Sequence, residues 1–211
     1  KNIKLDFKNI GLIHKAYKES LKIIKEFKPD IVIGVGGYVT FPVIMAAHKL
    51  KIKTFLHEQN SIPGKSNKFL IKYADKIGLS FTDSSKYFPK DKWILTGNPC
   101  SENAINIKAT SRTKYGLSYD KKSILIVQGS LGSEVINNKM LPFLQSIDNE
   151  PYEVLYVTGK NYYENYSKNK FSKNVKIVPY VENLSSLLKD IDLIITRAGA
   201  STIAEITSLG L

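Results

Sequence analysis

The stretch Thr196-Arg197-Ala198-Gly199-Ala200-Ser201-Thr202-Ile203-Ala204-Glu205 decides the fold of the C-terminal half of the chain. It follows the short apolar run 192–195, which is typical of a buried strand, and the small residues around Gly199 allow a tight turn. Thr202 and Glu205 have capping-box spacing, which predicts that a helix begins beside Thr202. Backbone N–H groups at such a helix start suit a diphosphate. Glu205 then either binds a ribose diol or only caps its own helix.

Short apolar strands and helices alternate along the rest of the chain, and this predicts an α/β fold with parallel sheets. The expected strands are 30–35, 52–56, 77–81, 93–95, 124–127, 154–157, 175–178 and 192–195. The expected helices are 11–28, 39–50, 65–74, 134–146 and 183–189, in addition to the one that follows Gly199. The polar segment 99–121 interrupts the alternation and is expected to connect an N-terminal domain, 1–98, with a C-terminal domain, 122–211. Two such half-sheets are expected to face each other across a cleft that holds the ligand.

The composition narrows the class of protein. The chain carries a net charge of +12, but only two of its 31 basic residues are arginine. A nucleic-acid reader usually needs the arginine fork, so the lysines reflect either codon bias or a surface that faces anionic lipid or substrate. The single cysteine, Cys100, excludes an internal disulfide and a cysteine-based metal cluster. With no long apolar run and no signal peptide at the first residues, a cytosolic setting is the default.

Glycine-rich and polar loops follow several of the expected strands. Gly36 and Gly37 form a strand-to-helix turn that either holds a phosphate or needs glycine only for its geometry. The dinucleotide spacing G-x-G-x-x-G fails because residue 39 is valine. The polar loop 57–60 contains His57, which is either a base or a structural residue, and no metal-ligand spacing accompanies it. The loop 129–132 lacks the lysine of a P-loop, although the Ser130 hydroxyl and loop amides suffice to bind one phosphate.

Taken in order, these motifs resemble the MurG-type N-acetylglucosaminyltransferases of glycosyltransferase family 28. The matching pieces are Lys28-Pro29-Asp30, residues 34–42, His57-Glu58-Gln59-Asn60, Pro63-Gly64 with Asn67, Gly97-Asn98-Pro99, residues 129–132 with Asn137, and residues 196–210. The resemblance implies a GT-B fold with two Rossmann-like domains. It further implies inverting transfer of N-acetylglucosamine from UDP-N-acetylglucosamine to lipid I, which gives lipid II, with no cofactor and no metal.

The resemblance also assigns residues to the two substrates. On the side of UDP-N-acetylglucosamine it implies Glu205 for the ribose, Ser130 for a phosphate, the backbone of Val181 for uracil and Asn60 for the sugar. The nucleotide and diphosphate would be lined by Ala200, Ser201, Thr202, Ile203 and Ala204. On the side of the acceptor diphosphate it implies Gly36, Gly37 and Tyr38.

The chain departs from the family pattern in three ways. The family's first glycine-rich loop, which carries the candidate base, is expected before residue 1, so the catalytic residue is left unassigned. Part of the donor site is expected after residue 211, so both domains are expected to be truncated and this piece alone inactive. An arginine that many members carry after Asn-Pro is replaced by Cys100 and Ser101. A UDP-sugar epimerase of the same fold, and a basic protein that binds nucleic acid, are the alternative functions.

A basic helix adds a prediction about location. Lys65, Lys68 and Lys72 recur along the segment 65–74 beside Phe69, and such a face suits an anionic lipid surface. An ordinary solvated lysine face is the alternative. The first interpretation predicts a peripheral protein on the cytoplasmic face of the bacterial cell membrane.

Overall fold

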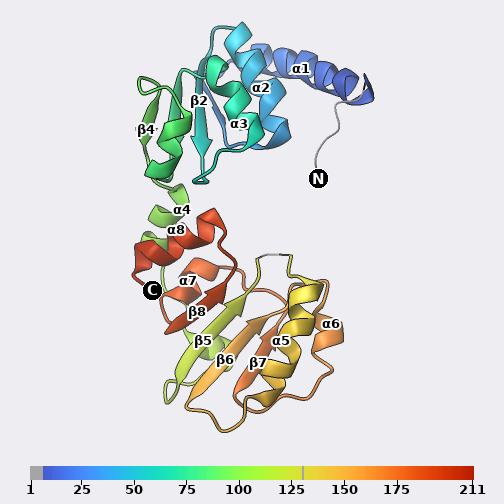
Figure 1. The fold of residues 1–211 in the computed structure, drawn as a ribbon, viewed down its shortest axis with the longest axis vertical. Helices are drawn as coiled ribbons and strands as arrows, with labels where there is room; N and C mark the ends of the chain where they lie inside the picture. Colours follow the sequence, from blue (N-terminus) through green and yellow to red (C-terminus); the bar gives the residue numbers. More distant parts are fainter. Residues whose placement is uncertain (1–6, 130) are drawn as a thin grey trace. The chain divides into compact units, whose positions relative to one another are not determined.

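The computed structural model describes residues 7–129 and 131–211, with the side chains of residues 7–10 excepted. It divides into two compact units, residues 1–98 and 99–211, each built around its own parallel sheet (Figure 1). The α/β prediction is therefore confirmed. Ser130, the predicted phosphate contact, lies outside the described residues.

The first unit contains a four-stranded sheet in the order β1-β2-β3-β4. Its helices are α1 (Phe7–Phe27), α2 (Gly37–Lys49) and α3 (Lys65–Leu70), and its 3-10 helices are η1 (Ile71–Tyr73) and η2 (Thr82–Tyr87). Its strands are β1 (Ile31–Gly34), β2 (Lys53–Glu58), β3 (Lys76–Leu79) and β4 (Trp93–Leu95). Leu56, Ile77 and Leu79 from the strands pack against Ile44 and Leu70 from the helices to form the core of this unit.

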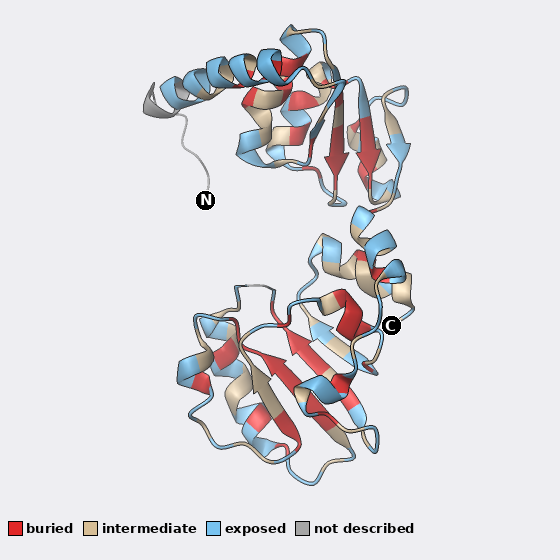
Figure 2. Cartoon of the chain, turned by 180° about the vertical axis from the view of Figure 1, so that it is seen from behind, coloured by how far each residue is buried: buried red, intermediate tan, exposed pale blue. Residues whose placement is uncertain are grey.

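The second unit contains a sheet in the order β7-β6-β5-β8. Its strands are β5 (Lys122–Val127), β6 (Tyr152–Val157), β7 (Val175–Val178) and β8 (Leu193–Thr196). Its helices are α4 (Pro99–Asn106), η3 (Arg112–Tyr115), α5 (Glu134–Ser146), α6 (Tyr163–Tyr166), α7 (Leu184–Leu188) and α8 (Ala200–Leu209). Figure 2 shows that buried residues concentrate in the inner strands, where β5 and β6 are apolar on both faces, as expected for a parallel sheet between helices.

Residues 99–121, expected to be a connection, fold with the second unit. They contain α4, which packs along α8, and η3. The hydroxyl of Ser101 donates to the Ala204 carbonyl over 3.0 Å, so the start of α4 is fixed to the middle of α8. The sequence of α4 does not predict a helix, because its residues are mostly polar and among them only Ala104 is buried.

One helix start and one strand end differ from their predictions. The capping-box prediction is wrong: α8 begins at Ala200, and Gly199 is its N-cap residue. Thr202 and Glu205 therefore lie within the helix. In the first unit, β2 continues through His57 and Glu58, which were expected in a loop, because both residues pair with β3.

Candidate functional site

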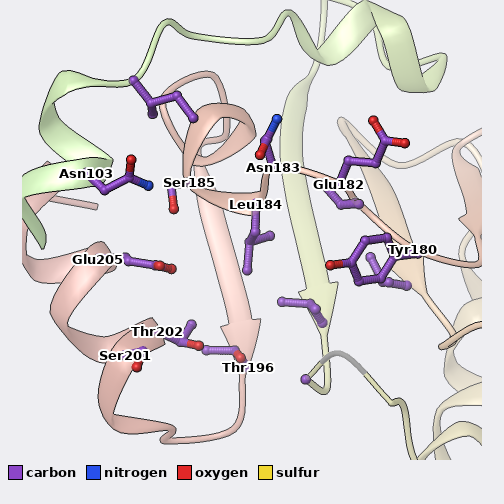
Figure 3. Close-up of a pocket in the computed structure, with 15 residues that line it drawn as sticks. Asn103, Tyr180, Glu182, Asn183, Leu184, Ser185, Thr196, Ser201, Thr202 and Glu205 are labelled. Carbon is purple, nitrogen blue, oxygen red and sulfur yellow. The ribbon is translucent and has the colours of Figure 1, made fainter. Parts of the chain in front are cut away.

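A cavity of about 390 Å³ opens beside the carboxyl ends of β5 and β8 in the second unit (Figure 3). Val127 of β5 and Thr196 of β8 are register partners, so the two strands end side by side. The residues that line the cavity are Asn103, Ile107, Val127, Gly129, Val157, Tyr180, Val181, Glu182, Asn183, Leu184, Ser185, Thr196, Ser201, Thr202 and Glu205. Ligands in parallel α/β sheets bind beyond the carboxyl ends of the strands, which makes this cavity the candidate site.

Glu205 provides a carboxylate at one wall of this cavity. In Figure 3 its side chain extends from α8 into the cavity. Burial raises the pKa of Glu205 above the ordinary 4.5, and the Ser185 hydroxyl opposes this shift and lowers the pKa. A partly desolvated carboxylate favours any ligand that donates hydrogen bonds to it, as a sugar diol does.

The structure brings together part of the predicted donor set. Val181, Ser201, Thr202 and Glu205 all line the cavity. Ala200, Ile203 and Ala204 are not among its lining residues; Ala204 is buried, and its carbonyl accepts the bond from Ser101. Asn103 and Ser185 line the cavity without having been predicted, because they come from α4 and α7 and reach it only through tertiary packing.

A second, smaller cavity of about 260 Å³ lies at the same strand ends. Its lining residues are Gln128, Gly129, Thr196, Arg197, Ala198, Gly199 and Thr202. Gly129, Thr196 and Thr202 line both cavities, so the two adjoin along the start of α8. The larger cavity contains two carboxylates, those of Glu182 and Glu205, whereas the described lining of the smaller one contains a guanidinium and no carboxylate.

In the first unit, Gly36 and Gly37 form the turn from β1 into α2. Both have positive φ angles, 93° and 79°, which favour glycine. The Ser66 hydroxyl of α3 donates to the Gly37 carbonyl over 2.7 Å and holds the turn from outside. Tyr38, the next residue, is 75% exposed. The turn leaves the first amides of a thirteen-residue helix open, which is a geometry suited to an anion.

Glu58 organises the loop that contains Asn60. Its carboxylate is 1% exposed and accepts hydrogen bonds from the backbone N–H of Asn60 and Gly64. It also accepts from the side-chain amides of Asn60, over 3.0 Å, and Asn67, over 2.9 Å. Four N–H donors thus satisfy one buried carboxylate, so the chain itself fixes the position of Asn60.

His57 is engaged within the same unit. Its Nε2 donates to the Gly97 carbonyl over 3.0 Å, and the ring is buried. This contact to the backbone of a distant segment supports a structural role for this histidine. Among the described residues, no cluster of histidine, cysteine, aspartate and glutamate is arranged to hold a metal ion.

The basic segment on α3 and η1 is exposed as predicted. Lys65, Lys68 and Lys72 are exposed, and Phe69 is 48% exposed. The Lys72 ammonium lies 4.9 Å from the centre of the Phe69 ring, which also packs on Phe41 of α2 with 4.8 Å between ring centres. The segment therefore combines positive charge with accessible aromatic surface. In the described part of the chain, no helix has both the length and the apolar character needed to cross a bilayer.

Comparison with known proteins identifies the family. The model of the glycosyltransferase family 28 N-terminal domain matches residues 1–79, and the model of its C-terminal domain matches residues 123–211. The chain belongs to glycosyltransferase family 28. The first matched segment lies within the first unit, which contains the turn at Gly36 and Gly37. The second matched segment lies within the second unit, which contains the two cavities.

Two similar proteins are transferases that carry the same name. The UDP-N-acetylglucosamine–N-acetylmuramyl-(pentapeptide) pyrophosphoryl-undecaprenol N-acetylglucosamine transferase of Bacillus subtilis is 43% identical, over 99% of this chain and 60% of the relative. The transferase of the same name from Leuconostoc mesenteroides is 44% identical, over 98% of this chain and 58% of the relative. The chain thus spans about 60% of the length of the curated relatives it matches.

Solved structures show the same fold. The crystal structure of Acinetobacter baumannii MurG has a TM-score of 0.68 and 28% identity, over 94% of this chain and 55% of the other. A putative UDP-N-acetylglucosamine 2-epimerase from Listeria monocytogenes has a TM-score of 0.71 at 13% identity, over 94% of this chain and 60% of the other. At that identity, the likeness to the epimerase shows the fold alone. These structures confirm the GT-B fold class.

Proposed function

We propose that the complete protein transfers N-acetylglucosamine from UDP-N-acetylglucosamine to lipid I and so forms lipid II for peptidoglycan synthesis. Membership of glycosyltransferase family 28 and the names of the relatives at more than 40% identity support this reaction. The observation that carries the proposal is the cavity beside the N-terminal half of α8, with the Glu205 carboxylate in its wall.

In this proposal the larger cavity binds the nucleoside. Glu205 accepts hydrogen bonds from the ribose hydroxyls, and the backbone of Val181 contacts the uracil. The segment from Ala200 to Ala204 provides the helix start beside the diphosphate, and Ser130 provides a phosphate contact. Asn60, which the first unit fixes through Glu58, contacts the transferred sugar.

The acceptor diphosphate is assigned to the first unit. Gly36, Gly37 and Tyr38 lie at the start of α2, where backbone amides and the helix dipole favour an anion. The acceptor hydroxyl then attacks the anomeric carbon, the bond from that carbon to the diphosphate breaks, and a base takes the hydroxyl proton. The amides at the start of α8 stabilise the charge that develops on the departing UDP.

The test is Glu205→Ala in the complete protein, with UDP-N-acetylglucosamine binding measured by calorimetry. Loss of hydrogen bonds to a carboxylate predicts an affinity about tenfold or more lower. Glu164→Ala, an exposed glutamate on α6, is the matched control and should bind normally. Unchanged affinity of the Glu205 variant would refute the assignment of this cavity to the donor.

A second measurement separates transfer from epimerisation. A transferase releases UDP in proportion to the lipid acceptor supplied, whereas an epimerase converts the sugar nucleotide without any acceptor. We expect UDP release only when lipid I is present. Conversion of UDP-N-acetylglucosamine to its epimer in the absence of lipid would overturn the proposed reaction.

We also assign Lys65, Lys68, Phe69 and Lys72 to the membrane side of the first unit, on the cytoplasmic face. Each basic residue close to an anionic membrane contributes about 1 kcal/mol of binding. A triple Lys→Glu variant of these lysines should therefore sediment poorly with anionic vesicles. The matched control reverses three exposed lysines of the second unit, Lys168, Lys170 and Lys173, and should sediment normally. Equal sedimentation of both variants would reject the membrane assignment.

A further inference from the structure

Asn103 is a cavity residue outside the segments that the family models match. It lies on α4, within residues 80–122, which separate the two matched segments. Asn103 is exposed and lines the larger cavity. Figure 3 shows that Asn103, Ser185 and Glu205 come from three different helices, α4, α7 and α8. The wall of this cavity therefore includes an amide, a hydroxyl and a carboxylate that distant parts of the sequence supply.

Helix α4 is held at both ends against the rest of the second unit. In its first turn, a serine hydroxyl donates to a carbonyl of α8 over 3.0 Å. At its other end, the Lys189 ammonium donates to the Ile105 and Ile107 carbonyls, each over 2.6 Å, and Lys189 directly follows α7. Because α4 is fixed to both α7 and α8, the backbone of Asn103 has a set position relative to Glu205.

Ser185 fixes the Glu205 carboxylate from a third helix. Ser185 is 7% exposed, and its hydroxyl donates a hydrogen bond to Glu205. Leu187 and Leu188 of the same helix are buried in the core of the second unit, so α7 is itself well anchored. A carboxylate has several lone pairs, and Glu205 can therefore accept hydrogen bonds from a ligand while it keeps the bond from Ser185.

The described lining of the larger cavity suits a ligand with hydroxyl groups. This lining contains two carboxylates and no lysine or arginine, so it does not attract an anion. A carboxylate only accepts hydrogen bonds, whereas each hydroxyl of a diol both donates and accepts. The side-chain amide of Asn103 supplies N–H donors for the hydroxyl oxygens. Glu205 and Asn103 are together complementary to a diol that donates to the first and accepts from the second.

We propose that Asn103 is a specificity residue for the sugar of the nucleotide: its amide donates to a ribose hydroxyl oxygen while Glu205 accepts the hydroxyl protons. This inference rests on the proposed function, because it takes the larger cavity as the nucleoside site. A site that hydrogen-bonds a hydroxyl disfavours an analogue without it, since polar groups of the site are then left unpaired. The two residues therefore select a ribonucleoside diphosphate over a deoxyribonucleoside diphosphate.

The test measures the binding of UDP, 2′-deoxy-UDP and 3′-deoxy-UDP to the complete protein by calorimetry. Asn103→Ala loses one hydrogen bond, so it should weaken UDP about fivefold and reduce the preference for UDP over at least one deoxy analogue by the same factor. Asn103→Asp keeps the size of the side chain but cannot donate, so it should weaken UDP at least as much. The matched control is Asn106→Ala, an exposed asparagine of the same helix that is not among the lining residues of either cavity; it should bind all three ligands normally.

Two outcomes would overturn the inference. Unchanged UDP affinity of Asn103→Ala would show that this amide does not contact the nucleotide. Equal weakening of all three ligands would place its contact away from the ribose hydroxyls. Alanine favours a helix at an exposed position, so the variant should fold, and thermal unfolding checks this. Glu205→Ala separates these failures from a failure of the proposed function, because it must weaken UDP if the larger cavity holds the nucleoside, whatever Asn103 does.

Discussion

The loop after β2 and the turn after β5 use their polar side chains differently. In the first unit, Glu58 is 1% exposed and accepts three hydrogen bonds from its own loop and one from α3. In the second unit, Gln128 lines the smaller cavity, and Glu205 lines the larger one and is only partly desolvated. A polar group that the chain already satisfies maintains the fold, whereas one left open at a cavity is available to a ligand. The density of polar residues in a motif does not distinguish these cases.

The largest effect is expected when Glu58 is removed. Glu58→Ala deprives the amides of Asn60, Gly64 and Asn67 of their shared acceptor and should lower the unfolding free energy of the first unit by about 3 kcal/mol. Trp93 is the single tryptophan of the chain and lies in β4, so its fluorescence during urea unfolding reports on this unit.

Gln128→Leu is the matched comparison for this effect. It removes an amide at the wall of the smaller cavity and should leave the unfolding of the second unit, followed by circular dichroism, unchanged. A normal unfolding midpoint for Glu58→Ala would mean that the loop is held by other contacts, and the contrast between the two loops would fail.

A smaller effect is expected on the pH dependence of UDP binding. Because burial raises the pKa of Glu205, its carboxylate gains a proton at a higher pH than an ordinary glutamate does. Affinity for UDP should therefore fall severalfold as the pH is lowered through this raised pKa, since a protonated carboxyl accepts hydrogen bonds less well. Ser185→Ala removes the group that lowers this pKa, so the midpoint should move further up.

The titration of UDP itself must be separated from that of the protein. Glu205→Gln cannot titrate at this position, so its residual pH dependence belongs to the ligand and to other groups. Subtracting this residual pH dependence from the wild-type curve leaves the contribution of Glu205 to UDP binding. Identical curves for the wild type and the Glu205→Gln variant would exclude this carboxylate from the nucleotide site.

The positions of the inner strands were predictable from local pattern. The apolar runs at 124–127 and 154–157 lie within β5 and β6, because buried parallel strands read as continuous apolar segments. The start of α8 was predicted beside Thr202 but lies at Ala200, because Gly199 is the N-cap residue in place of a hydroxyl side chain.

The remainder of the site depends on contacts between distant segments. Asn103 reaches the cavity because Ser101 bonds to Ala204, 103 positions along the chain, and Ser185 reaches it through the packing of α7. No periodicity or spacing encodes such contacts. Gln128 was equally hidden, since one polar residue after a strand is ordinary until its place at a cavity wall is known.

The smallest expected effect is on the stability of the second unit. The raised pKa of Glu205 means that the folded chain holds this proton more tightly than the unfolded chain does, so the ionised carboxylate destabilises the fold above the raised pKa. Glu205→Gln should therefore raise the unfolding free energy, by less than about 1 kcal/mol because solvent screens a partly exposed group. The gain should be present near neutral pH and vanish as the pH falls below the ordinary pKa of glutamate. Circular dichroism during urea unfolding measures it, and a loss of stability instead would show that the carboxylate supports the fold as Glu58 does.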